Sequence, residues 1–126
     1  MKKKINLSRK RKVNLSELRN ISACFTGDEK HHIGLAEASE MTRAYRKSNP
    51  NQTIAHFFGK QAILEILNQS NCVGIRIYYA NDPITGRKHL IIVGAESNKN
   101  DICHGLIAER AICCPTNCGK QNLLNS

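Results

Sequence analysis

The side chains best suited to chemistry in this sequence gather near its C-terminal end, where four cysteines and one histidine lie within sixteen positions. Thiolate and imidazole are the preferred ligands of zinc, and a structural zinc site uses four of them. If this cluster binds zinc, we expect the ligands to be Cys103, His104, Cys114 and Cys118, with Pro115 and Gly119 shaping the loop between the last two cysteines.

The spacing of these cysteines leaves other interpretations open. Three residues separate Cys114 from Cys118, so the two-residue gap typical of zinc ribbons and redox motifs is missing. A disulfide between Cys114 and Cys118 is one alternative, and a nucleophilic Cys103 is another. Reduced cysteines often serve as small apolar side chains. The spacing favours this structural role, so no cofactor is expected by default and zinc remains the alternative.

A second group of polar residues could contact an anion or a partner protein. His56 precedes two phenylalanines, and Gly59-Lys60 places a cation at the start of a predicted helix. Arg76 lies in a predicted strand and is a further candidate for such a contact. No nucleophile–base pair accompanies these residues, and the Gly-rich run of a phosphate loop is absent. The sequence therefore gives no catalytic residue and favours a protein that is not an enzyme.

The positive charge of the chain is concentrated at its beginning. The formal net charge is +9, and seven of the 19 Lys and Arg residues lie in the first twelve positions. Residues 1–12 are therefore expected to form a basic, disordered tail, with a single α+β domain over 13–126. The tail could contact nucleic acid or an anionic surface. It lacks the apolar run of a signal peptide, and no stretch is long enough to span a membrane, so a cytoplasmic location is expected.

The other elements must form around residues 73–94, which read as a β-hairpin. In the first arm Val73, Ile75, Ile77 and Tyr79 alternate with other residues, which predicts a strand with this face buried. The second arm is a continuous apolar run over 89–93, typical of a strand covered on both faces. Asp82-Pro83 and Thr85-Gly86 supply the turn between the arms.

Two amphipathic helices are predicted before the hairpin, over about 35–47 and 58–68. Each has apolar residues at three- and four-residue intervals and charged residues outside that stripe. A lone hairpin is marginal in water, so we expect both helices to pack on it. The prediction is an α+β fold: a small antiparallel sheet centred on the hairpin, with the two helices against it.

Several segments resemble a family of small, uncharacterised bacterial proteins. The similarity covers roughly residues 33–126 and leaves out the basic tail. It implies a single compact domain and brings no activity, cofactor or catalytic residue. The segments are HFFGKQAILEIL from His56, CVGIRIYY from Cys72, IIVGAESN from Ile91, CPTNCG from Cys114 and the closing LLNS.

Three functional hypotheses follow from these patterns. The leading one is a non-enzymatic interaction module with an unknown protein partner, because no reactive constellation emerges. The second is a protein that binds structural zinc or responds to redox conditions through the C-terminal cysteines. The third is weak binding of nucleic acid or an anionic surface through the tail.

Overall fold

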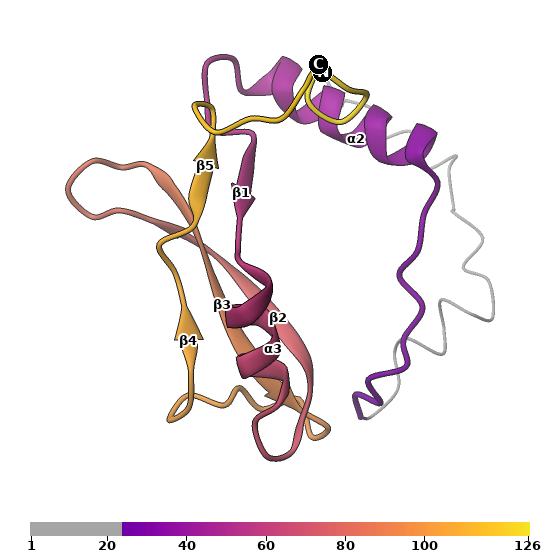
Figure 1. Ribbon diagram of the computed structural model, residues 1–126, viewed down its shortest axis with the longest axis vertical. Coiled ribbons are helices and arrows are strands. Elements are labelled where there is room, and N and C mark those ends of the chain that lie inside the picture. The colour runs from indigo at the N-terminus through magenta and orange to yellow at the C-terminus, as the bar shows by residue number, and fades with distance from the viewer. Residues whose placement is uncertain (1–23) are drawn as a thin grey trace, which may run out of the picture.

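The computed structural model describes residues 24–126 and shows an α+β fold with two helices and two small antiparallel sheets. The elements appear along the chain as α2 (Leu35–Ser48), β1 (Ala55–Phe57), α3 (Lys60–Leu67), β2 (Cys72–Asn81), β3 (Lys88–Glu96), β4 (Ile107–Ala108) and β5 (Ile112–Cys114) (Figure 1). The predicted fold class is confirmed. The basic tail over residues 1–12 lies outside the described residues.

The predicted hairpin forms the centre of the molecule. Strands β2 and β3 pair antiparallel from Cys72 with Glu96 to Asn81 with Lys88, and β4 adds to the other side of β3. Strand β3 is therefore the central strand of a sheet with the order β2-β3-β4. Of its predicted apolar run over 89–93, Ile92 and Val93 are buried at 3% and 4% exposed, as expected for a strand covered on both faces, whereas residues 89–91 are only half-buried.

The predicted buried face of β2 is wrong over most of its length. Ile75, Ile77 and Tyr79 are 38%, 47% and 93% exposed. Ile75 pairs with Gly94, and a Cβ atom added to Gly94 would meet the side chain of Gln69, which follows α3 directly. The side chains of Ile75, Ile77 and Tyr79 therefore lie on the face of the sheet that α3 covers. An eight-residue helix is only about 12 Å long, whereas ten strand residues span about 33 Å. The helix therefore leaves the second half of β2 uncovered.

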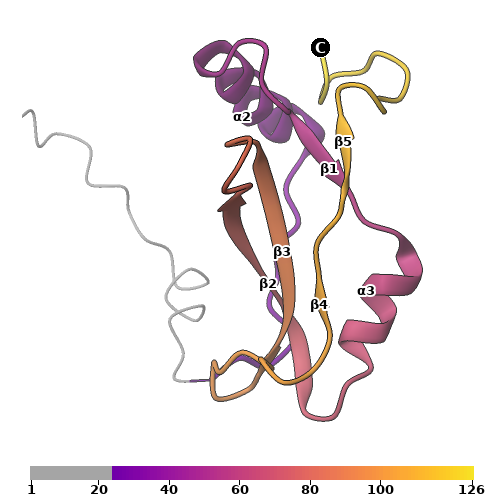
Figure 2. The same ribbon diagram turned by 90° about the vertical axis from the view of Figure 1, so that its left-hand side faces the viewer.

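Helix α3 provides the packing that was expected of both helices. It lies against β2 and β3, and its Ile66 is 1% exposed (Figure 2). Helix α2 lies near the opposite end of the molecule, where Tyr45 reaches the hairpin at Lys88. Its Leu35 and Met41 remain 56% and 63% exposed, so its apolar stripe is only partly used.

A second, two-stranded sheet joins distant parts of the chain. Strand β1 pairs antiparallel with β5, and His56 lies opposite Cys113. The C-terminal segment then returns to α2, where the guanidinium of Arg46 donates hydrogen bonds to the carbonyl oxygens of Leu124 and Ser126, each at 2.6 Å. Among the described residues, neither helix is long and apolar enough to cross a membrane.

Candidate binding sites on the hairpin

Strand β2 is an edge of the three-stranded sheet, and its backbone geometry can be derived from the turn. The amide of Asp82 donates to the carbonyl of Arg87 at 2.8 Å, which makes these residues a hydrogen-bonded pair. Hydrogen-bonded and non-hydrogen-bonded pairs alternate along an antiparallel ladder. The even-numbered residues of β2 therefore bond to β3, and the N–H and C=O groups of Ile75, Ile77 and Tyr79 point away from it.

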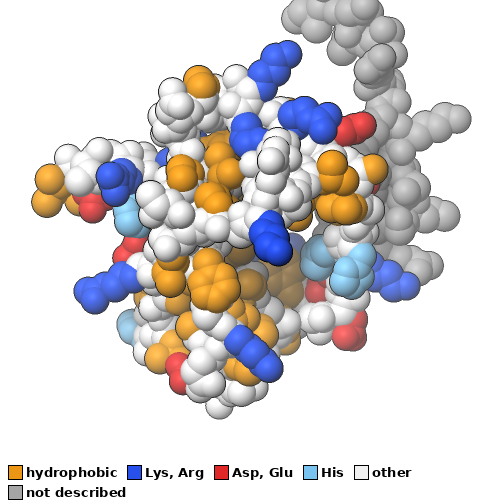
Figure 3. Space-filling view, turned by 45° about the horizontal axis from the view of Figure 1, so that its top comes forward, with side chains coloured by type: hydrophobic (Ala, Val, Ile, Leu, Met, Phe, Trp, Pro, Cys, Tyr) orange, Lys and Arg blue, Asp and Glu red, His pale blue; other side chains and the backbone are white. Residues whose placement is uncertain are grey.

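The outward-pointing backbone groups belong to the residues with exposed apolar side chains. Near the start of β2, the segment that contains Gly27 approaches the carbonyl of Val73 and a β-bulge interrupts the pairing between Cys72 and Gly74. From Ile75 onward, no described strand pairs with this edge. Apolar side chains also gather in patches on the face shown in Figure 3. Among residues 24–126, the second half of β2 is thus an open and apolar sheet edge.

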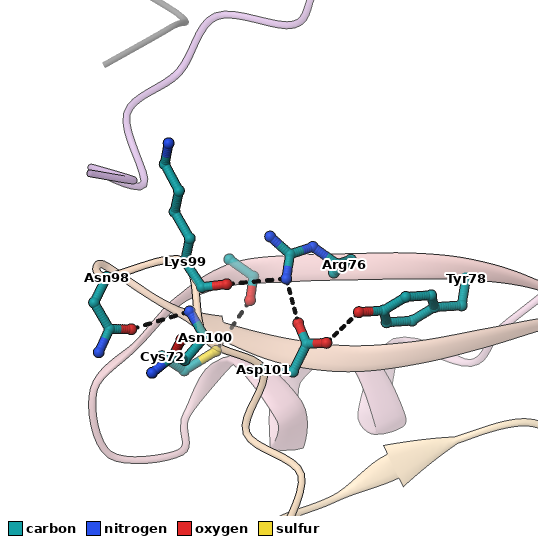
Figure 4. A network of polar contacts seen from close by, with 8 residues as sticks. Cys72, Arg76, Tyr78, Asn98, Lys99, Asn100 and Asp101 are labelled. Carbon is teal, nitrogen blue, oxygen red and sulfur yellow. Dashed lines mark hydrogen bonds and ion pairs between the residues drawn. The ribbon is translucent and has the colours of Figure 1, made fainter. Parts of the chain in front are cut away.

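A polar network lies on the opposite face of β2 (Figure 4). One carboxylate oxygen of Asp101 accepts a hydrogen bond from Arg76 at 2.5 Å, and the other accepts one from the Tyr78 hydroxyl. The hydrogen bond from Tyr78, together with that from Arg76, lowers the pKa of Asp101, and the bond to Asp101 raises the pKa of Tyr78. This network fastens the loop after β3 to the edge strand.

The guanidinium of Arg76 has further partners. It donates to the carbonyl oxygen of Lys99 at 3.0 Å, and its central carbon lies 5.4 Å from the centroid of the Phe25 ring. The Phe25 amide in turn donates to the carbonyl of Ser97 at 2.8 Å. Arg76, expected as an anion or partner contact, is therefore held by groups of its own chain.

One groove is lined by a predicted site residue, His56, and lies where α2 and β1 meet the turn end of the hairpin. We call it the hairpin-end groove; its volume is about 570 Å³. Two tyrosines, two histidines, one lysine, Thr53 and Asn81 contribute its polar groups, and Ile54, Ala80 and Leu90 contribute apolar wall. Its lining includes Tyr45, Ile54, His56, Tyr79, Lys88 and Leu90.

His56 reaches this groove because β1 holds it beside β3. Its Nε2 lies 3.0 Å from the carbonyl oxygen of Lys88, and both residues are half-buried. Lys60, predicted as a companion of His56, is the exposed first residue of α3 and does not line the groove. The structure thus brings His56 together with Lys88, and does not bring it together with Lys60 or Arg76.

The C-terminal cysteines separate into two places. Cys114 and Cys118 are joined by a disulfide with their Cα atoms 4.8 Å apart. Cys103 and His104 lie in the exposed turn before β4, at the opposite end of the molecule from β5 in both ribbon views. Within residues 24–126, no group of three or more His, Cys, Asp or Glu side chains is arranged to hold a metal ion. The residues predicted to bind zinc are therefore not assembled into one site.

No protein-family model, no curated protein and no solved structure matches this chain. The resemblance to a family of small bacterial proteins therefore stays a prediction.

Two features of these sites were missed from the sequence. The sequence patterns indicate neither Tyr45 nor Lys88 as a site residue, although both line the groove. A signal was present, because Lys88 directly precedes a doubly covered strand and its charge needs a polar partner at that boundary. The open edge of β2 gave no such signal, since alternation cannot tell how far a helix will cover a face.

Proposed function

We propose that this protein is a non-enzymatic interaction module that binds an extended segment of a partner protein by adding it as a strand to β2. The observation that carries the proposal is the coincidence, at Ile77 and Tyr79, of outward-pointing backbone groups and exposed apolar side chains. In β-strand addition, main-chain hydrogen bonds supply affinity and alternate side chains supply specificity. Both elements are present at Ile77 and at Tyr79.

The chemistry of β2 supports this use of its edge. Natural edge strands are usually protected by lysines, prolines or bulges. Over residues 75–81 the strand contains no lysine or proline, and its one charged side chain is turned to Asp101. The partner segment expected here is extended and carries β-branched or aromatic residues at alternate positions, because these pack beside Ile77 and Tyr79.

Panning of a random peptide library displayed on phage against the full chain tests the proposal. Enriched peptides should share an alternating apolar pattern and should lose binding to Ile77→Lys, which introduces a charge at the edge. Ile84→Lys is the matched control, because Ile84 is 92% exposed in the turn and outside the strand. It should bind the peptides as the native chain does.

Two results would overturn the proposal. One is the absence of any enriched peptide, and the other is equal loss of binding by Ile77→Lys and Ile84→Lys. Sedimentation of the unliganded chain distinguishes a further case. If Ile77→Lys abolishes self-association rather than peptide binding, the edge pairs with a second copy of the chain.

A redox-sensitive role is a second candidate function, and the Cys114–Cys118 disulfide favours it. In the cytoplasm expected from the sequence, thiols are kept reduced and persistent disulfides are rare. We propose that an external dithiol reduces this bond, becoming a disulfide itself as Cys114 and Cys118 become thiols. Mass spectrometry of thiol-labelled protein from rapidly acidified cells tests this, and a pair that is fully oxidised or fully reduced in all conditions would contradict it.

A further inference from the structure

The ammonium group of Lys88 lies in the hairpin-end groove beside neutral partners. Its Nζ atom is 2.6 Å from the hydroxyl of Tyr45, 3.4 Å from Oδ1 of Asn49 and 4.7 Å from the centroid of the Tyr45 ring. Ion pairs within the described chain join Arg76 to Asp101 and His89 to Glu109, and none involves Lys88. The partners of this ammonium among the described residues are therefore neutral acceptors, and a carboxylate in the groove would form a stronger, charge-assisted hydrogen bond with it.

The surrounding contacts hold this ammonium in place and leave it able to donate. The Tyr45 hydroxyl donates to the carbonyl of Thr53 at 3.2 Å, so its oxygen is oriented to accept from Lys88. An ammonium has three N–H donors, and Tyr45 takes one while the longer contact to Asn49 takes a second. The third N–H is available to an acceptor that enters the groove.

His56 adds a second polar group whose role follows from its partner. A carbonyl oxygen can only accept, so the Nε2 atom that lies 3.0 Å from the Lys88 carbonyl carries the proton. In the neutral ring, Nδ1 is then an acceptor. His89 also lines the groove, but its ring is paired with Glu109. Lys88 is therefore the cation of the groove that has no anionic partner among residues 24–126.

From this arrangement we propose that the hairpin-end groove binds a carboxylate attached to a small apolar or aromatic group, with Lys88 as the cation that recognises it. The groove volume of about 570 Å³ falls within the roughly 300–1,000 Å³ typical of small-ligand sites. Ile54, Leu90 and the Tyr79 ring provide apolar walls for the rest of the ligand. The carboxylate can belong to a free organic acid or to the C-terminus of a peptide.

The groove suits a carboxylate better than a phosphate. Phosphate sites usually combine bidentate arginines with clustered backbone N–H groups, which together balance two negative charges. The described lining contains one unpaired ammonium and no arginine. This inference does not rest on strand addition to β2, because its ligand binds through a side-chain cation rather than through the backbone of the edge.

Titration of the full-length, ¹⁵N-labelled chain with N-acetyl-L-phenylalanine tests the proposal, with N-acetyl-L-phenylalaninamide as the uncharged control. The acid should shift the backbone resonances of His56, Tyr79 and Lys88, and should bind at least about tenfold more tightly than the amide, as expected for hydrogen bonds to a charged group. A dipeptide with a free or amidated C-terminus separates the two sources of the carboxylate. Tighter binding of the free dipeptide than of the acetylated amino acid indicates a peptide terminus.

Lys88→Met removes the charge and keeps most of the aliphatic stem, so it should weaken binding of the acid about tenfold or more and leave the amide unchanged. Arg87→Met is the matched control, because Arg87 is the exposed neighbour outside the groove lining. Lys88→Gln replaces Lys88→Met if the latter fails to fold. Equal binding of acid and amide, equal weakening by Arg87→Met and Lys88→Met, or no shift up to the solubility limit of the probe would overturn the proposal.

Discussion

The carboxylate of Asp101 lies 2.5 Å from the guanidinium of Arg76, although the two residues are 25 positions apart. Asp101 follows the turn after β3, and Arg76 is near the middle of β2. The contact therefore joins the loop that follows β3 to the edge strand β2. It also removes the one charged side chain of β2 from the edge that we propose for partner binding.

Replacement of Asp101 by asparagine should lower the free energy of unfolding by about 1 kcal/mol at pH 7. A hydrogen-bonded charge pair is worth somewhat more when buried, but the side chains of Arg76 and Asp101 are 31% and 18% exposed and are partly screened by solvent. Urea denaturation followed by circular dichroism measures the difference. Asp28→Asn, an exposed carboxyl in the loop before α2, is the control and should change little.

The contribution of Asp101 should depend on pH in a defined direction. Its pKa is lowered from the ordinary value of 3.8, chiefly by the hydrogen bond from Tyr78, so the folded state binds its proton less readily than the unfolded state. The stabilisation is fully present above pH 3.8 and is lost as the pH falls through the folded pKa. The stability gap between native chain and Asp101→Asn should close in that range, and a gap that persists in acid would contradict the assignment.

Ile66→Ala should destabilise the fold strongly, by about 3 kcal/mol. Ile66 is 1% exposed where α3 meets the sheet, and a truncated core side chain loses both burial and packing. Leu64→Ala removes a similar side chain from the same helix at a position that is 41% exposed, and should cost less than about 1 kcal/mol. The urea midpoints of the two variants provide the comparison. Equal effects would show that α3 does not pack as described.

Counting reactive thiols tests whether Cys114 and Cys118 form a disulfide in solution. Protein denatured without reductant should gain two reactive thiols after reduction, because these two cysteines are joined in the structure. Cys114→Ser should abolish that gain by leaving Cys118 as a thiol. If zinc rather than a disulfide linked the cysteines, metal analysis would give about one ion per chain, and no thiols would be gained on reduction.

Glu29 should titrate at an unusually low pH. Its side chain accepts hydrogen bonds from the amide of Thr26 at 2.6 Å and from that of Gly27 at 2.9 Å. These bonds, with that from Thr26 the largest influence, lower the pKa of Glu29 to about 2. A titration of the side-chain carboxyl carbon by NMR measures this pKa. A value near that of a free glutamate would show that the loop over residues 26–29 is open in solution.

The local elements of this fold could be predicted because each is encoded over a few neighbouring residues. The hairpin follows from its turn residues and the unbroken apolar run of β3, and α3 follows from its apolar stripe. The pairing of β1 with β5 could not be predicted in this way. Three residues show too little alternation to mark a strand, and nothing local indicates which distant segment pairs with it.

The candidate sites were predictable only in part for a related reason. His56 was singled out by its type, but its companions in the groove come mainly from α2, β2 and β3 and depend on how these elements meet. The choice between zinc and a disulfide stayed open because it depends on whether Cys103 approaches Cys114. The exposure of Ile77 and Tyr79 depends on the length of α3 relative to β2, which periodicity does not measure.

The pairing of β1 with β5 sets an order of events on the ribosome. Phe57 lies opposite Ile112, roughly 55 residues later in the chain. At a synthesis rate of about 5–20 residues per second, β1 emerges about 3–11 seconds before its partner strand exists. During that interval the hairpin can already form, while His56 has no strand to hold it beside Lys88. The groove is therefore completed only after the residues of β5 (Ile112–Cys114) have been made.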